Sequence, residues 1–415
     1  MLERGDGVHK GAPVWTDALE PADSVYEYVS RTAEAVPAGV RWRTLTVENA
    51  PQYVTNLYNG VAGIALFLAD YHRLTRSARA LDLARDALRW CADAGAPLRL
   101  DFPAIGTDAS LGWGTAGVGL AWLRLAAATG DREFLRRAEA VAARLPDTAG
   151  LRRVTRLLFG DAGTGLFLVR LWEATQKDQH LAAAAETGAW LDRVATRDAQ
   201  GCLWTNSAGG VGPPRLGLGT GAAGVGYFWL VLHEATGDRA WLERAREVAS
   251  TLLAFSRPAG GVLGGVEWPW HTGTAESRCQ WCMGEPGIGL FFLKAHHATH
   301  KPAFLAAAAA AGETTFARGD VRANPGQCHG LAGNAEIFLQ LAGAPGSGQQ
   351  RWLERVRDFG RRAAAYRVSA PGGEVWPVDE PGHVSPDLMC GAAGVGHFFL
   401  RLATPEGQAV RHPFA

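Results

Sequence analysis

Two short segments contain the residue types best suited to chemistry, namely Trp281-Cys282-Met283-Gly284 and Cys328-His329-Gly330. Together they offer two thiols and one imidazole, a set of three ligands that suits Zn²⁺ and leaves one coordination position open. At an open position, zinc can bind and activate a water molecule or a substrate thiol. The alternative interpretation of the same residues is two buried cysteines and one core histidine.

A repeated Gly-x-x-Gly unit, followed each time by an apolar run, indicates how the two segments are positioned. The runs, such as 64–68 and 288–293, are apolar nearly all round, as expected of helices in an inner layer. Glycines at the start of such helices let several helix ends approach closely. Seven copies predict one repeated supersecondary element. They span residues 60–63, 114–117, 160–163, 221–224, 284–287, 330–333 and 391–394.

Amphipathic stretches rich in Ala, Arg and Glu lie between the glycine units and predict an outer layer of helices. We therefore predict an all-α fold, an α/α toroid of seven outer–inner helix pairs. Its glycine loops gather at one end of a central cavity. The whole chain, 1–415, is one domain in this prediction, with about 1–15 and 405–415 loosely ordered. The predicted outer helices include residues 20–35, 77–93, 131–145, 178–195, 239–256 and 347–366.

Four tryptophans precede glycine units at similar distances along the chain. Each one ends or follows a short segment of extended character that is bounded by Gly and Pro. We predict small β-ribbons that lead into the inner helices, with the tryptophans filling the seams between repeats. Contact with a substrate is the alternative role. The four residues are Trp42, Trp204, Trp268 and Trp376.

The repeat register explains how ligands that are far apart in the sequence can converge. Cys282 lies two residues before the first glycine of its unit. Cys328 holds the same position in the next unit, and His329 follows it. Since equivalent loops of adjacent repeats lie at the same end of the cavity, the register predicts that these three side chains meet. Zn²⁺ prefers such a set of nitrogen and sulfur ligands.

These motifs, placed within a sevenfold α/α toroid, resemble the lanthionine synthetase C-like family, the lanthipeptide cyclases. The resemblance covers about residues 20–405. It implies zinc, with Cys282, Cys328 and His329 as ligands, and a dehydrated precursor peptide as substrate. In that family, a zinc-bound cysteine thiolate of the peptide adds to dehydroalanine or dehydrobutyrine and closes a thioether ring. Separate dehydrating enzymes, a kinase and a lyase or a dehydratase, are implied because this chain has no kinase signature.

This addition reaction places demands on other side chains. Zinc coordination deprotonates a thiol whose ordinary pKa is about 8.5. Attack on the alkene then develops an enolate, which needs a cationic or hydrogen-bonding partner and afterwards a proton. Arg278, four residues before Cys282, corresponds to an arginine of the family and is assigned to electrostatic stabilisation or substrate positioning. A surface or salt-bridged arginine is the alternative.

Two positions differ from the family pattern, and both are positions at which the family has residues expected to take part in proton transfer. Thr220 stands where the bacterial cyclases have a histidine, and the segment that begins at Arg156 lacks their acidic residue. Displaced candidates for the acid are Asp161, His271 and His383, each of which is otherwise an ordinary surface or loop residue. Protonation by water, or a variant reaction, are the other options.

The remaining cysteines are too few for a disulfide scaffold. Cys279 forms a Cys-x-x-Cys pair with Cys282, but only Cys282 falls on the repeat position, so we expect Cys279 to be a bystander or to support the ligands. Cys390 is equivalent in register to His329, so it is either a thiol that faces the cavity or a small packed side chain. Small buried side chains are expected for Cys91 and Cys202.

Composition limits the partners and compartments. Lys+Arg and Asp+Glu both number 41, so nothing indicates a polyanionic partner such as nucleic acid or an anionic membrane. The first residues contain no apolar signal segment, and no apolar stretch reaches the length of a membrane span, so we expect a cytoplasmic protein.

Three alternatives to the cyclase stay open. One is a non-catalytic zinc-containing peptide-binding subunit, and another is the addition of a thiol such as glutathione to a dehydroamino acid. A glycan-processing toroid is the third, but it would need paired carboxylates at the cavity mouth. The two acids of the glycine loops, Asp161 and Glu285, stand in different repeats.

Overall fold

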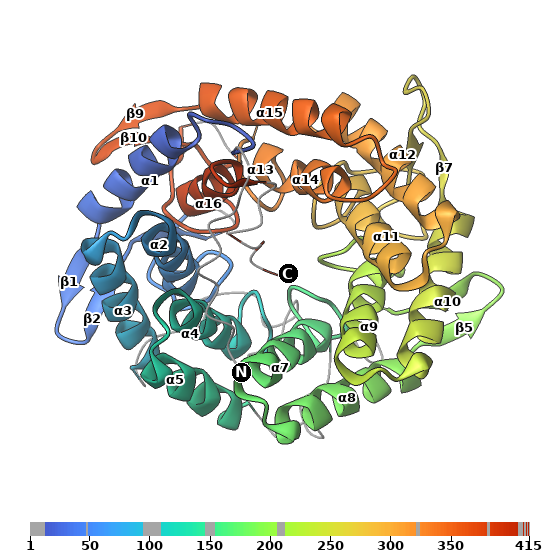
Figure 1. Cartoon of the computed structure of the whole chain (residues 1–415), viewed down its shortest axis with the longest axis horizontal. Helices are drawn as coiled ribbons and strands as arrows, with labels where there is room; N and C mark the ends of the chain where they lie inside the picture. The colour runs from blue at the N-terminus through green and yellow to red at the C-terminus, as the bar shows by residue number, and fades with distance from the viewer. Residues whose placement is uncertain are drawn as a thin grey trace.

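The computed structural model describes residues 13–46, 49–93, 109–145, 154–205, 212–320, 324–379, 382–405, 410, 412 and 414. Its helices form two concentric rings, with short strands at the periphery (Figure 1). The inner ring consists of α2 (Val61–Thr75), α4 (Thr115–Thr129), α7 (Asp161–Thr175), α9 (Ala222–Thr236), α11 (Glu285–Thr299), α13 (Leu331–Asn334) with α14 (Glu336–Ala342), and α16 (Ala392–Leu402). The outer ring consists of α1 (Leu19–Arg31), α3 (Ala78–Ala92), α5 (Arg132–Ala143), α8 (Asp178–Arg193), α10 (Arg239–Phe255), α12 (Pro302–Arg318) and α15 (Gln349–Ala365).

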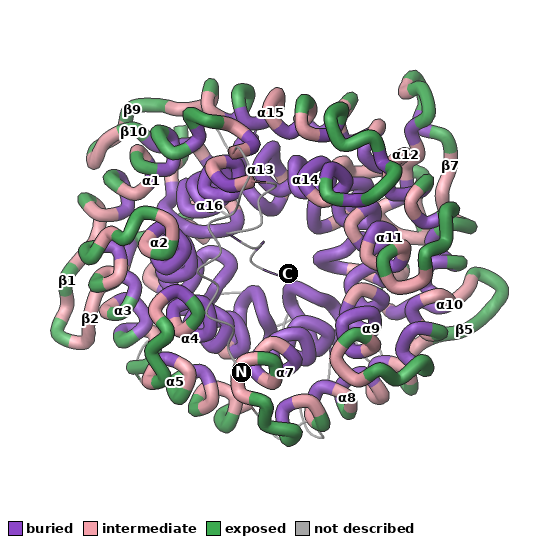
Figure 2. The backbone as a smooth tube through the Cα atoms, in the orientation of Figure 1, coloured by how far each residue is buried: buried purple, intermediate pink, exposed green. Residues whose placement is uncertain are grey.

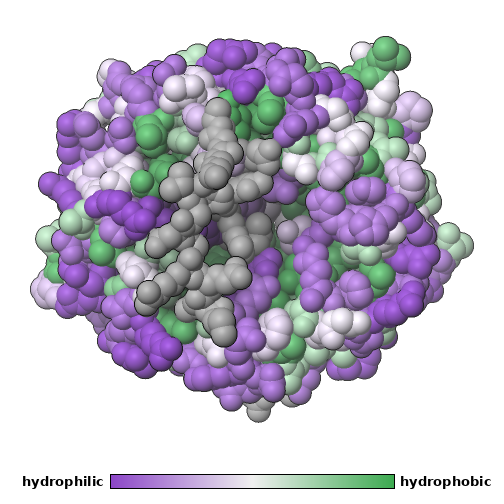
Figure 3. Space-filling model, viewed as in Figure 1, coloured by the Kyte–Doolittle hydropathy of each residue, from purple (hydrophilic) through white to green (hydrophobic). Residues whose placement is uncertain are grey.

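Burial separates the two rings as the apolar pattern predicted. The inner helices are buried over most of their length, whereas the outer helices bury one face and expose the other (Figure 2). In space-filling view, hydrophilic side chains dominate the rim of the visible face (Figure 3). The α/α toroid and its outer helices are therefore confirmed. None of the helices within the described ranges combines the length and apolar character needed to cross a membrane.

The outer and inner helices form the predicted pairs, and the structure shows which helix packs against which. From α3 onward, each outer helix packs mainly against the inner helix that precedes it in the chain, and α1 packs against α16. Backbone hydrogen bonds support this closure, because Trp15 N donates to Leu402 O at 2.9 Å and Val14 N donates to Thr404 O. The first and last helices thus form one pair, which closes the ring.

The described residues of the C-terminal tail lie in the centre of the ring. Val410, His412 and Phe414 are all buried, and the Phe414 ring stacks on Trp281 with centroids 5.3 Å apart. His412 Nε2 lies 3.0 Å from Gln327 Nε2, within hydrogen-bonding distance. These three residues are buried inside the ring, and the loose order expected for the tail as a whole stays a prediction. Residues 1–12 lie outside the described part.

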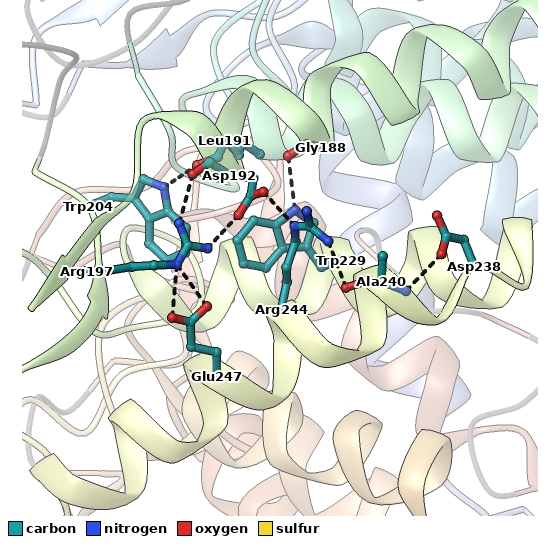
Figure 4. Close-up of polar contacts among 10 residues, drawn as sticks. All are labelled: Gly188, Leu191, Asp192, Arg197, Trp204, Trp229, Asp238, Ala240, Arg244 and Glu247. Atoms are coloured by element: carbon teal, nitrogen blue, oxygen red, sulfur yellow. Dashed lines mark hydrogen bonds and ion pairs between the residues drawn. The ribbon is translucent and has the colours of Figure 1, made fainter.

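The predicted β-ribbons are present as antiparallel hairpins of two strands. Each tryptophan indole donates a hydrogen bond to a carbonyl of an outer helix, as Trp204 Nε1 does to Leu191 O at 2.8 Å (Figure 4). The equivalent bonds reach Val29, Leu252 and Ala363. These tryptophans fill the seams between repeats. The hairpins are β1 (Glu34–Val36) with β2 (Gly39–Arg41), β5 (Thr196–Asp198) with β6 (Gly201–Leu203), β7 (Arg257–Pro258) with β8 (Val266–Glu267), β9 (Val368–Ala370) with β10 (Gly373–Val375), and an unpredicted β3 (Thr44–Leu45) with β4 (Pro51–Gln52).

The second glycine of each unit allows the seven loops to converge. A Cβ added at Gly117 would meet Leu111 O at 2.2 Å and the Leu57 Cβ of the preceding repeat at 2.6 Å. The same pair of clashes, with the loop's own carbonyl and with the preceding repeat, recurs in the other units. In the first unit the neighbour is the last repeat, since Gly63 meets Leu388. Glycine is required here by close backbone approach.

Replacing Gly117 with alanine should therefore lower the free energy of unfolding by about 1–3 kcal/mol, because backbone atoms must shift to admit one methyl group. Chemical denaturation of the full chain measures this effect. The matched control is Gly260→Ala, where an added Cβ meets nothing within 4 Å and the backbone φ is not positive. That control should change stability by less than about 0.5 kcal/mol. Equal losses in both variants would contradict the role of close approach.

Candidate functional site

Seven equivalent loop residues, each two positions before the first glycine of its unit, form a circle of backbone hydrogen bonds. The N–H of one residue donates to the C=O of its counterpart in the next repeat, with distances of 2.5 to 2.9 Å. Among the described residues, six of these links are present, and the link from Cys282 N to Cys328 O is not. The circle is thus open between the two cysteines. Its members are Tyr58, Gly112, Leu158, Gly219, Cys282, Cys328 and Met389.

The opening holds a cluster of metal-ligating side chains. One ligand atom from each of Cys282, Cys328 and His329 lies within 4.8 Å of the other two. Both thiols are free and only 1% exposed, and His329 is partly accessible. The structure thus brings together the three residues that the repeat register singled out. Two sulfur donors and one imidazole at this spacing form a donor set that suits a borderline-soft metal ion.

Asp379 fixes the imidazole of His329. Its Oδ2 lies 2.8 Å from His329 Nδ1, and Asn324 Nδ2 donates to its other oxygen. Burial lowers the pKa of His329, but the Cys328 sulfur and Asp379 outweigh this effect and raise that pKa well above its ordinary value. A carboxylate on one ring nitrogen orients the ring and leaves Nε2 as the atom available to a metal.

Two further groups border the same cluster. The Cys390 thiol, His329 and Asp379 also lie within 4.8 Å of one another, and Cys390 Sγ is 3.7 Å from the Tyr58 hydroxyl. Burial raises the pKa of Cys390 to about 12, and burial raises the pKa of Cys328 well above its ordinary value. Without a nearby cation these thiols stay protonated at neutral pH. A bound metal ion supplies the positive charge that thiolates need, so the residues fit such a group.

Arg278 lies beside the cluster on an aromatic platform. Its guanidinium is 4.2 Å from the centroid of the Trp270 ring, and its Nη1 lies 4.0 Å from Met283 Sδ. Glu276 pairs with it at 3.3 Å on the exposed side. The arginine is therefore only partly neutralised, and its charge is available to a substrate.

His271 lies next to Trp270, the same aromatic ring that Arg278 contacts. Its ring meets Trp270 edge-on, and its Nδ1 accepts a hydrogen bond from Gly273 N at 2.9 Å. Burial, and then Arg215 and Arg278, lower its pKa. The imidazole is consequently neutral at pH 7, with its proton on Nε2.

The other candidates are not members of either metal-ligating group within the described part of the chain. Asp161 is buried at the start of α7, and His383 is exposed on the loop before α16. Cys279 is also outside these groups, and burial and then Glu285 raise the pKa of its thiol. Thr220 is buried in its glycine loop, which leaves the position of the family's histidine without a titratable group.

Sequence reasoning missed three residues that the structure places here. Tyr58 holds the same register position as Cys282 and Cys328, so the repeat alignment contained the signal for it. Arg215 holds the register position of Arg278, six residues before the first glycine of its unit. Asp379 follows β10 and carries no pattern in the sequence that points to the cluster.

A cavity of about 110 Å³ lies inside the ring, apart from the metal-ligating cluster. Leu157, Leu218 and Trp281 line it, together with inner-helix side chains and the tail residues His412 and Phe414. None of Cys282, Cys328 and His329 lines this cavity. The tail thus occupies space that the toroid would otherwise leave open.

The double ring and its glycine loops define an α/α toroid, and comparison with known proteins narrows the class. Residues 51–415 match the family model described as lanthionine synthetase C-like protein, so the chain belongs to that family. Among solved structures, nisin cyclase is similar with a TM-score of 0.63 and 17% identity, over 84% of this chain and 88% of that one. The GH76A alpha-1,6-mannanase from Salegentibacter sp. HEL1_6 is similar with a TM-score of 0.50 and 14% identity, over 93% and 98% of the two chains. At these identities the structural similarity concerns the fold alone.

Asp379→Asn should weaken metal binding by about 10–100-fold, because the imidazole loses the carboxylate that orients it and raises its basicity. Competition between the metal-free protein and a chromophoric chelator measures the affinity. Asp178→Asn, at an exposed position on α8, is the matched control and should retain the affinity of the original chain. An unchanged affinity in Asp379→Asn would mean that this carboxylate does not support the ligand.

Proposed function

We propose that this protein is a zinc-dependent cyclase that forms thioether rings in a dehydrated precursor peptide. The observation that carries the proposal is the convergence of Cys282, Cys328 and His329 in a chain of the lanthionine synthetase C-like family. Two thiolates and one imidazole are the ligands of a catalytic zinc site with one position open for the substrate. The substrate has to come from a separate dehydrating reaction, because the alkene must exist before the thiol can add to it.

When bound, zinc would lower the pKa of the peptide's thiol and hold the thiolate. Cys282 and Cys328 would hold the ion through their sulfurs, and His329 through the ring nitrogen that Asp379 leaves available. The Tyr58 hydroxyl remains protonated, because burial raises its pKa well above the ordinary value. It therefore stays a neutral hydrogen-bonding group beside the sulfur atoms, and its oxygen accepts a hydrogen bond from Cys390 Sγ at 3.7 Å.

Arg278 supplies positive charge where the addition develops negative charge. As the C–S bond forms, the electron pair of the alkene moves toward the neighbouring amide, whose oxygen becomes an enolate oxygen. A guanidinium beside Cys282 stabilises that oxygen. The proton lost by the thiol returns to the α-carbon, so the ring is an isomer of the linear peptide. His271 is neutral and adjacent to Arg278, which suits a base that accepts and returns this proton, with Asp161 as a second candidate.

The protein isolated from zinc-supplemented cultures should contain about one zinc ion per chain, since the cluster offers one set of three ligands. Elemental analysis after gel filtration measures the stoichiometry. Cys282→Ala and Cys328→Ala should lose the ion, because two ligands do not hold it tightly. Cys202→Ala removes a buried thiol from β6 and should retain it. Full zinc content in both ligand variants would place the ion elsewhere.

Incubation of the zinc-loaded protein with a dehydrated, cysteine-containing peptide should consume the free thiol without changing the peptide mass. The mass is conserved because S–H adds across the double bond within one molecule. Alkylation of remaining thiols followed by mass spectrometry measures the conversion, and Cys328→Ala should abolish it.

Each alternative function gives a different result in the same experiment. Addition of an external thiol such as glutathione would increase the peptide mass by that of the thiol. A peptide-binding subunit without catalysis would bind the peptide and leave its thiol free. Ring formation that survives the loss of zinc would contradict the proposed role of the metal.

A further inference from the structure

Three arginines lie near one another with few carboxylates among the described residues to balance them, and one of them, Arg215, is close enough to Cys282 to interact with the charge of its sulfur. Arg215 and Arg278 contact the same aromatic ring, with guanidinium carbons 5.2 and 4.2 Å from the Trp270 centroid. Arg156, in the loop that leads into α7, lies close enough to Arg215 for the two charges to repel. Burial, and then this repulsion, lower the pKa of Arg156 to about 10, so it remains charged at neutral pH.

Arg156 is the most unusual of the three, because it is buried and no carboxylate of the described residues pairs with it. Its side chain is 5% exposed, and neither its Nε nor its Nη1 has a hydrogen-bond partner in the described structure. No carboxylate among the described residues pairs with Arg156 or Arg215, and only the exposed Glu276 reaches Arg278. A buried guanidinium that lacks a counter-charge has lost its hydration without compensation, so such a group favours the binding of an anion.

The metal-ligating cluster does not provide this anion. Two thiolates and one divalent cation carry no net charge together, so a loaded metal site leaves the arginines unneutralised. Like Cys282 and Cys328, Arg215 and Arg278 hold equivalent positions in adjacent repeats. Each arginine stands six residues before the first glycine of its unit. The same register that converges the two cysteines therefore converges two guanidinium groups next to them.

We propose that Arg156, Arg215 and Arg278 form an oxyanion-binding subsite that holds a carboxylate or phosphate group of the peptide substrate beside Cys282. The planar donor fork of arginine matches the oxygen geometry of both anions. That the anion is carried by a peptide rests on the proposed function. Binding of the anion itself does not, because it depends only on residues described in this structure.

Equilibrium binding tests the subsite without using ring formation as the readout. The probes are inorganic phosphate and three versions of one short peptide, which carry a phosphoserine, a free C-terminal carboxylate, or neither charge with an amidated C-terminus. Calorimetry on the full chain at constant ionic strength should show that the anionic probes bind at least about tenfold more tightly than the neutral peptide. Whichever charged peptide binds more tightly identifies the source of the anion. Equal binding of all three peptides would overturn the proposal.

Arg156→Met is the decisive variant. It should weaken phosphate binding by about tenfold or more, and it should keep or increase the melting temperature without ligand, because an unpaired buried charge is removed. Phosphate should raise the melting temperature of the original chain and not that of the variant. Arg246→Met removes an exposed arginine that pairs with Glu243 on α10 and should bind phosphate as the original chain does. Unchanged binding in Arg156→Met would overturn the subsite.

Arg215→Met provides a second variant if Arg156→Met does not fold, and it should show the same loss of phosphate binding. Failure of the subsite and failure of the proposed function give different results. If the protein binds anions but forms no rings, the proposed subsite is supported and the proposed cyclase function is rejected. If it forms rings but binds charged and neutral peptides equally, the cyclase function is supported and the subsite is rejected.

Discussion

The loops that lead into neighbouring inner helices must approach one another closely enough for backbone hydrogen bonds, and much of the sequence pattern follows from this requirement. The second glycine of each unit is needed because a Cβ there would collide with a carbonyl of its own loop and with a side chain of the preceding repeat, as at Gly117. The link that is missing from the circle lies between Cys282 and Cys328. A metal ion held by both sulfurs would join repeats five and six at this opening, so the proposed catalytic group would also complete the ring.

Burial affects the cysteines and the arginines of the site in opposite ways, because buried thiolates need a nearby cation and a buried guanidinium needs a nearby anion. On one side, desolvation keeps the thiols of Cys328 and Cys390 protonated until a cation arrives. On the other side, the guanidinium of Arg156 is buried, and the described residues offer it no counter-charge. A metal ion would stabilise the thiolates, and an oxyanion would stabilise the arginine. Substrate selection by such a site would depend on charge as well as on the presence of a thiol.

The repeat made much of this architecture predictable from the sequence alone. The toroid, the outer helices, the ribbons with their tryptophans, and the convergence of Cys282 with Cys328 all follow from positions relative to the glycines. Asp379 was not predictable, because it follows β10 on a loop outside the register and reaches His329 only through the tertiary fold. The pairing of α1 with α16 was missed since sequence order favours the nearest neighbour, whereas ring closure unites the two ends. The buried tail residues, such as Phe414, lack any periodic pattern.

The pairing of α1 with α16 has a consequence for how the protein is made. The apolar face of α1, with Val25 and Val29, is synthesised long before its partner helix α16, because most of the described helices lie between them in the sequence. During translation this face meets its main packing partner only after α16 has been made. Contacts of such long sequence separation slow folding and leave apolar surface open to aggregation.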